Sequence, residues 1–159
     1  MIEQHKQGRS VINDFNRQNV EAMMKISHLG IAVKDLASAE KIFRKLLGDD
    51  NVHHEEVADQ QVRIASFQLG DAMVELTEPT SADSPISKFL EKRGEGIHHL
   101  AFEVEDVNSE LARLKGEGFQ LLDEKSRLGS HGMQIAFLHP KSTNGVLVEL
   151  CQLPEDESR

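Results

Sequence analysis

The chain repeats a strand-like segment that carries a histidine. Residues 26–36 read ISHLGIAVKDL, residues 97–107 read IHHLAFEVEDV, and His28 in the first segment falls on His99 in the second. A second pair of segments, MVEL at 73–76 and LVEL at 147–150, places Glu75 on Glu149. Self-similarity of this kind indicates two copies of one structural unit. Each copy supplies one imidazole and one carboxylate.

Both copies predict the same order of elements: a strand, a helix and three further strands. In the first copy, apolar residues alternate from Ile26, and Asp35 precedes an apolar helical stripe that ends at Gly48. Ser84 and Pro85 begin a short helix in the connection between the copies. The strands predicted after the first helix span 52–57, 62–69 and 72–77. In the second copy a helix follows the aspartate at position 106, strands are predicted at 119–122, 133–138 and 145–152, and the glycine-containing stretch 127–132 is predicted to be a loop.

These elements predict an α+β fold. Two tandem βαβββ modules are expected to form one curved mixed sheet around a metal-centred cavity, preceded by an N-terminal helix. The expected boundaries are a helical extension at 1–24, module one at 25–78, a linker helix segment at 79–96, module two at 97–152 and a tail at 153–159.

The composition is that of a globular chain, with 38% hydrophobic and 28% charged residues among 159. The net charge of −9 argues against nucleic acid or an anionic membrane as the main partner. No apolar run approaches the roughly 20 residues of a membrane span, and the N-terminus lacks the apolar core of a signal peptide. Cys151 is the only cysteine, so neither a disulfide framework nor a cysteine-rich zinc site is expected, and a cytoplasmic location is the simplest expectation.

The strand pattern also predicts which side chains share a face. Side chains alternate between the two faces of a strand, and both His28 and His99 lie opposite the bulky apolar residues that must pack on a helix. Glu75 likewise lies opposite Val74 and Leu76. Glu149 lies opposite Val148 and Leu150, on the face that it shares with Leu147 and Cys151. If the modules pair with two-fold pseudosymmetry, all four side chains line one cavity.

Four such side chains predict a metal site. A carboxylate among apolar strand residues is unfavourable unless it is paired or bound to a metal, and two imidazoles with two carboxylates suit Zn²⁺, Ni²⁺, Co²⁺ or Mn²⁺. Protein ligands that leave coordination positions open form catalytic sites. A single strand histidine is more often a hydrogen-bonded structural residue, so the duplication carries the argument.

His98 is expected to be structural or to support a ligand. His131 lies in a glycine-containing loop, from which it could reach a ligand. The histidines expected to be solvated are His5, His53 and His54, and His139 is expected to lie in a turn.

Several longer stretches resemble a known family. They read HLGIAVKDL from His28, VELTEP from Val74, DSPISKFLEKRGEGIHHLAFEV from Asp83 and FLHPKSTNGVLVEL from Phe137. Together they resemble the methylmalonyl-CoA epimerase branch of the vicinal oxygen chelate superfamily over about residues 25–152. The resemblance implies a single domain over this range, a homodimer, an acyl-CoA substrate and a divalent metal ion. The metal ligands that it implies are His28, Glu75, His99 and Glu149.

The implied activity is interconversion of (R)- and (S)-methylmalonyl-CoA by abstraction of the α-proton through a metal-stabilised enolate. The resemblance assigns a proton-transfer role to Glu149. Some similar epimerases have Gln at the position of Glu75 and an acidic residue on the preceding strand, where this chain has Ile64. We therefore expect Glu75 to act both as a ligand and as the second catalytic carboxylate.

Three other activities compete with this one. The ligand order His-Glu-His-Glu also resembles some glyoxalase I enzymes, which isomerise a glutathione hemithioacetal. A ring-cleaving dioxygenase is disfavoured, because its iron site uses two histidines and one carboxylate. A metal-free resistance protein that only binds small molecules has no need of four ligands.

Overall fold

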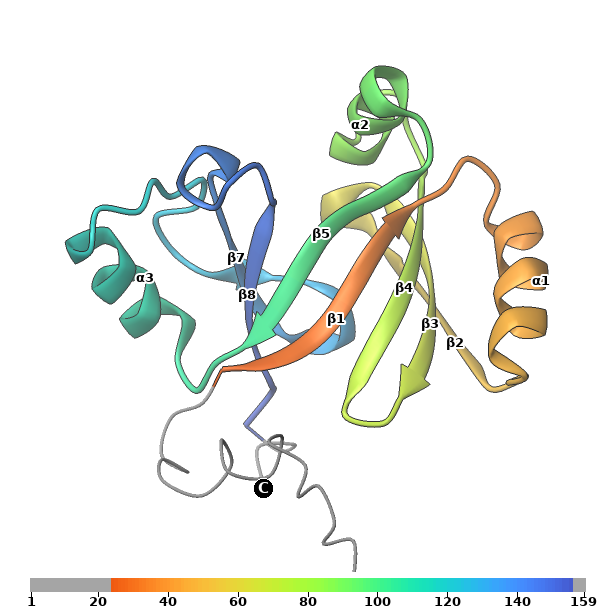
Figure 1. Ribbon diagram of the computed structural model, residues 1–159, viewed down its shortest axis with the longest axis horizontal. Coiled ribbons are helices and arrows are strands. Elements are labelled where there is room, and N and C mark those ends of the chain that lie inside the picture. Colours follow the sequence, from red (N-terminus) through yellow and green to blue (C-terminus); the bar gives the residue numbers. More distant parts are fainter. Residues whose placement is uncertain (1–23, 156–159) are drawn as a thin grey trace, which may run out of the picture.

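The described residues, 24–155 of a computed structural model, form one mixed sheet with helices packed at its sides (Figure 1). Its strand order is β2-β3-β4-β1-β5-β8-β7-β6. The helices are α1 (Leu36–Leu47), α2 (Pro85–Arg93) and α3 (Val107–Gly116), with short 3₁₀ turns η2 (Ala58–Gln60), η3 (Ser130–Gly132) and η4 (Pro140–Ser142). The strands are β1 (Lys25–Ala32), β2 (Val52–Val57), β3 (Val62–Leu69), β4 (Ala72–Pro79), β5 (Gly96–Glu103), β6 (Arg127–Leu128), β7 (Gln134–Leu138) and β8 (Val148–Gln152). The predicted α+β class is confirmed, while the predicted N-terminal helix lies outside the described residues.

The centre of the sheet repeats one arrangement twice. β1 pairs in parallel with β4, and β5 pairs in parallel with β8. The two module-initiating strands, β1 and β5, then pair with each other in antiparallel orientation. This pairing relates the modules by an approximate two-fold axis between β1 and β5, as the duplication predicts.

Local sequence signals fix the ends of the first helix in each module. Asp35 caps α1 by accepting a hydrogen bond from the Ser38 N–H at 2.7 Å, and Asp106 caps α3 by accepting from the Ser109 N–H at 2.6 Å. Gly48 ends α1 with a left-handed φ of 64°. Equivalent caps therefore begin equivalent helices after β1 and β5.

Each module has its own apolar core beneath its helix. α1 packs against β3 and β4 through a cluster that includes Phe67 and Leu76, both with no exposed surface. α3 packs against β7 and β8 through a cluster that includes Leu111 and Leu150. Figure 1 shows these two helices at opposite sides of the sheet. Because apolar side chains occupy the helix-facing side, the polar residues of β1, β4, β5 and β8 are left to the other face.

One sequence prediction in module two is wrong. Residues 119–122 do not form a strand; Leu121 makes only an isolated bridge to Leu138. The short strand β6 lies instead at Arg127–Leu128, in the stretch predicted to be a loop. The reason is a side chain: the Asp123 carboxylate accepts a hydrogen bond from the Phe137 N–H at 2.8 Å and so takes the place of a ladder partner.

Candidate metal centre

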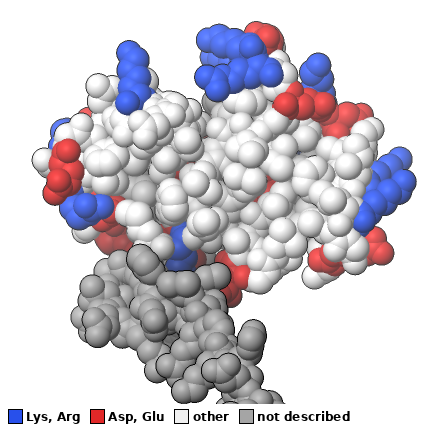
Figure 2. Space-filling view, in the orientation of Figure 1, with Lys and Arg blue, Asp and Glu red and all other residues white. Residues whose placement is uncertain are grey.

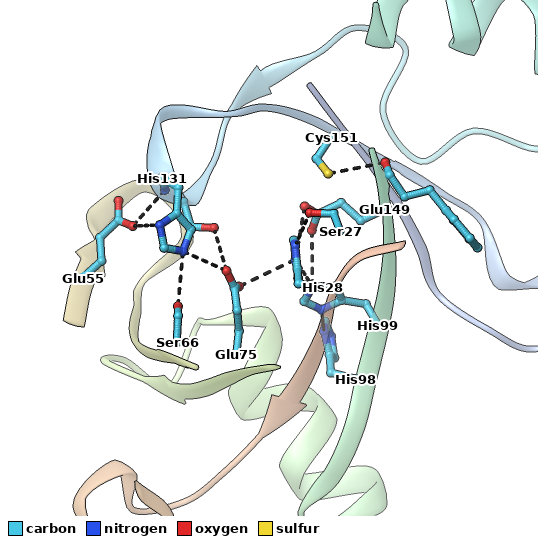
Figure 3. Close-up of polar contacts among 12 residues, drawn as sticks. Ser27, His28, Glu55, Ser66, Glu75, His98, His99, His131, Glu149 and Cys151 are labelled. Carbon is cyan, nitrogen blue, oxygen red and sulfur yellow. Dashed lines mark hydrogen bonds and ion pairs between the residues drawn. The ribbon is translucent and has the colours of Figure 1, made fainter. Parts of the chain in front are cut away.

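The four predicted residues come together on one face of the sheet, each from a different one of the four central strands (Figure 3). The Nε2 atoms of His28 and His99 lie 3.1 Å apart. His28 Nε2 lies 3.6 Å from a carboxylate oxygen of Glu75 and 3.6 Å from one of Glu149. His99 Nε2 lies 3.4 Å from the other oxygen of Glu149. The side chains converge on one face, as the strand pattern predicted.

Small residues make room for both imidazoles. In the register of β1 and β5, Gly30 lies opposite His99, and Ala101 lies opposite His28. A Cβ atom at Gly30 would lie only 2.1 Å from the His99 ring. The pseudosymmetric pairing therefore requires a small side chain beside each histidine.

The centre is buried. The exposed fraction is 1% for His28, 2% for Glu75, 8% for His99 and 4% for Glu149. Burial lowers the pKa of both histidines, that of His99 most strongly, so both rings are neutral and able to act as ligands. Burial and the neighbouring Glu75 raise the pKa of Glu149 well above its usual range. Burial acts in the same direction on Glu75, but a hydrogen bond from His131 and the nearby His28 lower its pKa overall.

The residue before each of the two histidines contacts the Nδ1 atom of that histidine, the ring nitrogen that points away from the other three side chains. Ser27 Oγ lies 3.1 Å from His28 Nδ1, and His98 Nδ1 lies 3.0 Å from His99 Nδ1. When Nδ1 carries the proton and donates it to these acceptors, the Nε2 lone pairs point into the centre. His98 is itself neutral, because burial lowers its pKa to about 4. His98 thus supports a candidate ligand, one of the two roles that the sequence predicted.

The donor set fits a divalent metal ion. Bonds of about 2.1 Å from such an ion place neighbouring ligand atoms roughly 3.0–3.4 Å apart. The four contacts among the imidazole and carboxylate atoms lie between 3.1 and 3.6 Å. A positive charge among these two neutral imidazoles and two buried carboxyl groups would stabilise the ionised form of both carboxylates.

A cavity of about 590 Å³ opens above these side chains. All four of them line it, and so do Ile64 and Thr77, which are cross-strand partners on β3 and β4. Ile64 is therefore in the cavity wall, where its apolar side chain cannot exchange a proton. The volume suits a small-molecule ligand.

The family profile described as "Glyoxalase/Bleomycin resistance protein/Dioxygenase superfamily" matches residues 27–137. The chain belongs to this superfamily. Among its relatives in the superfamily, the uncharacterized protein YqjC of Bacillus subtilis (strain 168) is 43% identical over 135 residues, which are 85% of this chain and 96% of YqjC. The mitochondrial methylmalonyl-CoA epimerase of Homo sapiens is 36% identical over 129 residues, 80% of this chain and 73% of the human protein.

A solved structure from the superfamily is also similar. It is methylmalonyl-CoA epimerase in complex with methylmalonyl-CoA and NH4+, with 38% sequence identity and a TM-score of 0.78. The match covers 86% of this chain and 99% of the solved one.

Sequence reasoning gave too little weight to His131, which lies in η3 of module two yet contacts Glu75 of module one. Its Nε2 lies 3.0 Å from the Glu75 carboxylate and 3.2 Å from Ser66 Oγ, and its backbone N–H donates to Glu55 at 2.8 Å (Figure 3). Ser130 Oγ donates a longer bond of 3.5 Å to the same Glu75 oxygen. The flanking glycines were the only sequence signal, because this contact spans 56 positions along the chain.

Cys151 also lies at the site, on the face of β8 that strand alternation predicted it to share with Glu149. It lies two residues after Glu149 on the same face of β8, and its sulfur lies within 4.8 Å of ligand atoms of His28 and Glu149. Burial raises the pKa of its thiol to about 12, and the thiol donates to the Phe102 carbonyl at 3.4 Å. Cys151 therefore lines the floor of the centre as a neutral thiol.

Proposed function

We propose that this chain is an isomerase that interconverts (R)- and (S)-methylmalonyl-CoA by removing and returning the proton on the α-carbon. One observation carries the proposal: two buried carboxylates and two imidazoles meet at the base of a cavity, in a chain that resembles methylmalonyl-CoA epimerases over most of its length.

His28, Glu75, His99 and Glu149 are the residues that would hold the divalent ion of such an enzyme. The donor set suits zinc, nickel, cobalt or manganese. When bound, the ion supplies a Lewis acid that favours negative charge on the acyl oxygens as the α-proton leaves.

Glu149 and Glu75 are the proposed proton-transfer groups. They lie on β8 and β4, on opposite sides of the central β1–β5 pair. Epimerisation needs a base on one face of the α-carbon and an acid on the other, and two carboxylates in these positions meet that need. Because Ile64 carries no ionisable group, Glu75 is the carboxylate that serves the module-one side.

The remainder of the substrate would extend out of the cavity. α2 borders the opening through Pro85 and Ile86, and basic side chains gather over this helix (Figure 2). Those of Lys88, Lys92 and Arg93 are exposed. They are the proposed partners of the coenzyme A phosphates.

We further propose that residues 25–152 form the catalytic domain and that the chain works as a cytoplasmic homodimer. The homodimer follows from the family resemblance, and the location from the single cysteine, which suits a reducing compartment. None of the helices in the part of the chain that the structure describes is long and apolar enough to cross a membrane. Light scattering of the purified protein tests the dimer.

The test is proton NMR of methylmalonyl-CoA in deuterated water. We expect the wild-type chain to exchange the α-proton for deuterium, and Glu75→Gln and Glu149→Gln each to lose at least about 100-fold in rate. Glu110→Gln is the matched control, because Glu110 pairs with Arg113 on the outer side of α3. Near-normal exchange in both site variants would refute the assignment.

The same samples separate the competing activities. Turnover of the methylglyoxal–glutathione adduct in preference to methylmalonyl-CoA would identify a glyoxalase I. Binding without turnover, in protein that retains no metal after purification without a His tag, would identify a small-molecule-binding resistance protein.

A further inference from the structure

The charges that line the cavity are strongly unbalanced. Five carboxylate side chains line it, and among the described lining residues Arg127 is the only lysine or arginine. An acyl-CoA with a free carboxylate brings further negative charge into this space. Apart from the metal ion, Arg127 is therefore the positive group of the wall that can receive it.

Arg127 is held in place from two sides. Its Nε lies 3.6 Å from an Asp123 carboxylate oxygen, and Asp123 is itself fixed by the hydrogen bond from the Phe137 N–H. The guanidinium carbon also lies over the Phe137 ring, 5.6 Å from its centroid. These contacts use Nε and one face of the guanidinium. Within residues 24–155, the two terminal nitrogens make no hydrogen bond or ion pair with a protein group.

The guanidinium also lies near the reacting centre. The Phe137 ring beneath it stands edge-on to the His99 ring, with the centroids 5.8 Å apart. A single aromatic ring thus separates Arg127 from a candidate metal ligand. Consistent with this, burial raises the pKa of Glu149, and the positive charge of Arg127 lowers it by a smaller amount.

We propose that Arg127 forms an anion-binding subsite at the wall of the cavity and binds the free carboxylate of a malonyl-type acyl-CoA. The inference rests on the proposed function, and it names the group that selects an acyl-CoA with a carboxylate over one without. A planar guanidinium with free terminal N–H groups matches a carboxylate through two parallel hydrogen bonds.

A phosphate of coenzyme A would offer similar chemistry, but its position argues against it. The pantetheine arm separates the phosphates from the thioester and would carry them out of the cavity. Arg127 is one ring away from His99, which places it beside the acyl group. The exposed cations of α2 lie at the opening instead.

The experiment compares Arg127→Gln and Arg127→Lys with wild type, using methylmalonyl-CoA as the substrate and propionyl-CoA, which lacks the carboxylate, as a competitive inhibitor. We expect Arg127→Gln to lower kcat/KM for methylmalonyl-CoA by about 10- to 100-fold, mainly through KM, as a lost charge-assisted hydrogen bond predicts. The kcat/KM of Arg127→Lys for methylmalonyl-CoA should lie between the values of wild type and Arg127→Gln. The inhibition constant of propionyl-CoA should change by less than about twofold.

Arg113→Gln is the matched control, because it removes the same charge from an arginine paired with Glu110 on α3. Arg113→Gln should change neither kcat/KM for methylmalonyl-CoA nor the inhibition constant of propionyl-CoA. The proposal is overturned if Arg127→Gln keeps wild-type KM, or if it weakens propionyl-CoA as much as methylmalonyl-CoA, which would mean that Arg127 binds a phosphate. A wild-type chain without any methylmalonyl-CoA turnover would instead refute the proposed function, and this inference with it.

Discussion

The substitution Gly30→Ala should disable the centre without touching any candidate ligand. A Cβ atom at this position would lie 2.1 Å from His99 Cε1, 2.4 Å from Nδ1 and 2.7 Å from Nε2, whereas ordinary contacts begin at 3.4 Å. The His99 ring would therefore have to move by roughly 1 Å or more. It cannot move freely, because His98 and Phe137 stand edge-on against it.

The size of the effect follows from this displacement. Overpacking of a buried site costs about 1–3 kcal/mol, which in a chain of this length lowers Tm by about 2–4 °C per kcal/mol. A shift of about 1 Å in a reacting group lowers activity about 100-fold. We expect the loss of activity and of metal affinity to exceed what the fall in Tm explains, because the displaced ring is a candidate ligand.

Calorimetric metal titration, thermal unfolding and the deuterium-exchange assay measure the three effects on one preparation. Gly116→Ala is the control: it lies in α3, and an added Cβ there meets no atom within 4 Å. This control should be neutral or slightly stabilising. Wild-type metal affinity and exchange rate in folded Gly30→Ala would show that His99 does not need its present position.

Three further predictions follow from the surroundings of the centre. His131→Ala removes the partner of the Glu75 carboxylate and should weaken metal binding by about 10- to 100-fold in a chelator-competition titration; unchanged affinity would contradict the contact's importance. Because burial lowers the pKa of His98 to about 4 while the unfolded chain binds a proton near 6.5, metal-free protein should lose stability as the pH falls from 6.5 to 4, by at most about 3 kcal/mol from this residue. Denaturant unfolding of wild type and His98→Gln measures that share, and equal pH slopes would argue against it. Thr77→Val removes a buried hydroxyl that has no hydrogen-bond partner within residues 24–155 and should raise Tm by about 2–4 °C, with a fall in Tm counting against this view.

The convergence of the four side chains was predictable because it depends on regular features. Strand alternation fixes the face of each residue, and the duplication fixes the equivalence of His28 with His99 and of Glu75 with Glu149. The caps Asp35 and Gly48 set the first helix in the same way. None of these inferences required knowledge of the path of a loop.

The supporting contacts were not predictable, because loops bring them about. His131 reaches Glu75 from η3 with a backbone φ of 53°, a conformation that no local pattern indicates for histidine. The Asp123 side chain, rather than a backbone carbonyl of the strand predicted at 119–122, accepts the hydrogen bond from the Phe137 N–H. The short strand lies further along the chain, and it places Arg127 beside the cavity. The strand pattern therefore predicts which four side chains form the centre. The residues around the centre depend on long-range side-chain contacts, which the pattern does not predict.

Metal stoichiometry is the most direct test of the central claim that the two modules provide one shared ion site. Protein purified without a His tag, stripped with a chelator and titrated with Co²⁺ or Zn²⁺ should bind one tight equivalent per chain. That equivalent should be lost in His28→Ala and His99→Ala, which remove the equivalent ligand from each module, and kept in His139→Ala. Tight binding that survives the loss of either His28 or His99, or no tight binding in the wild type, would contradict the account.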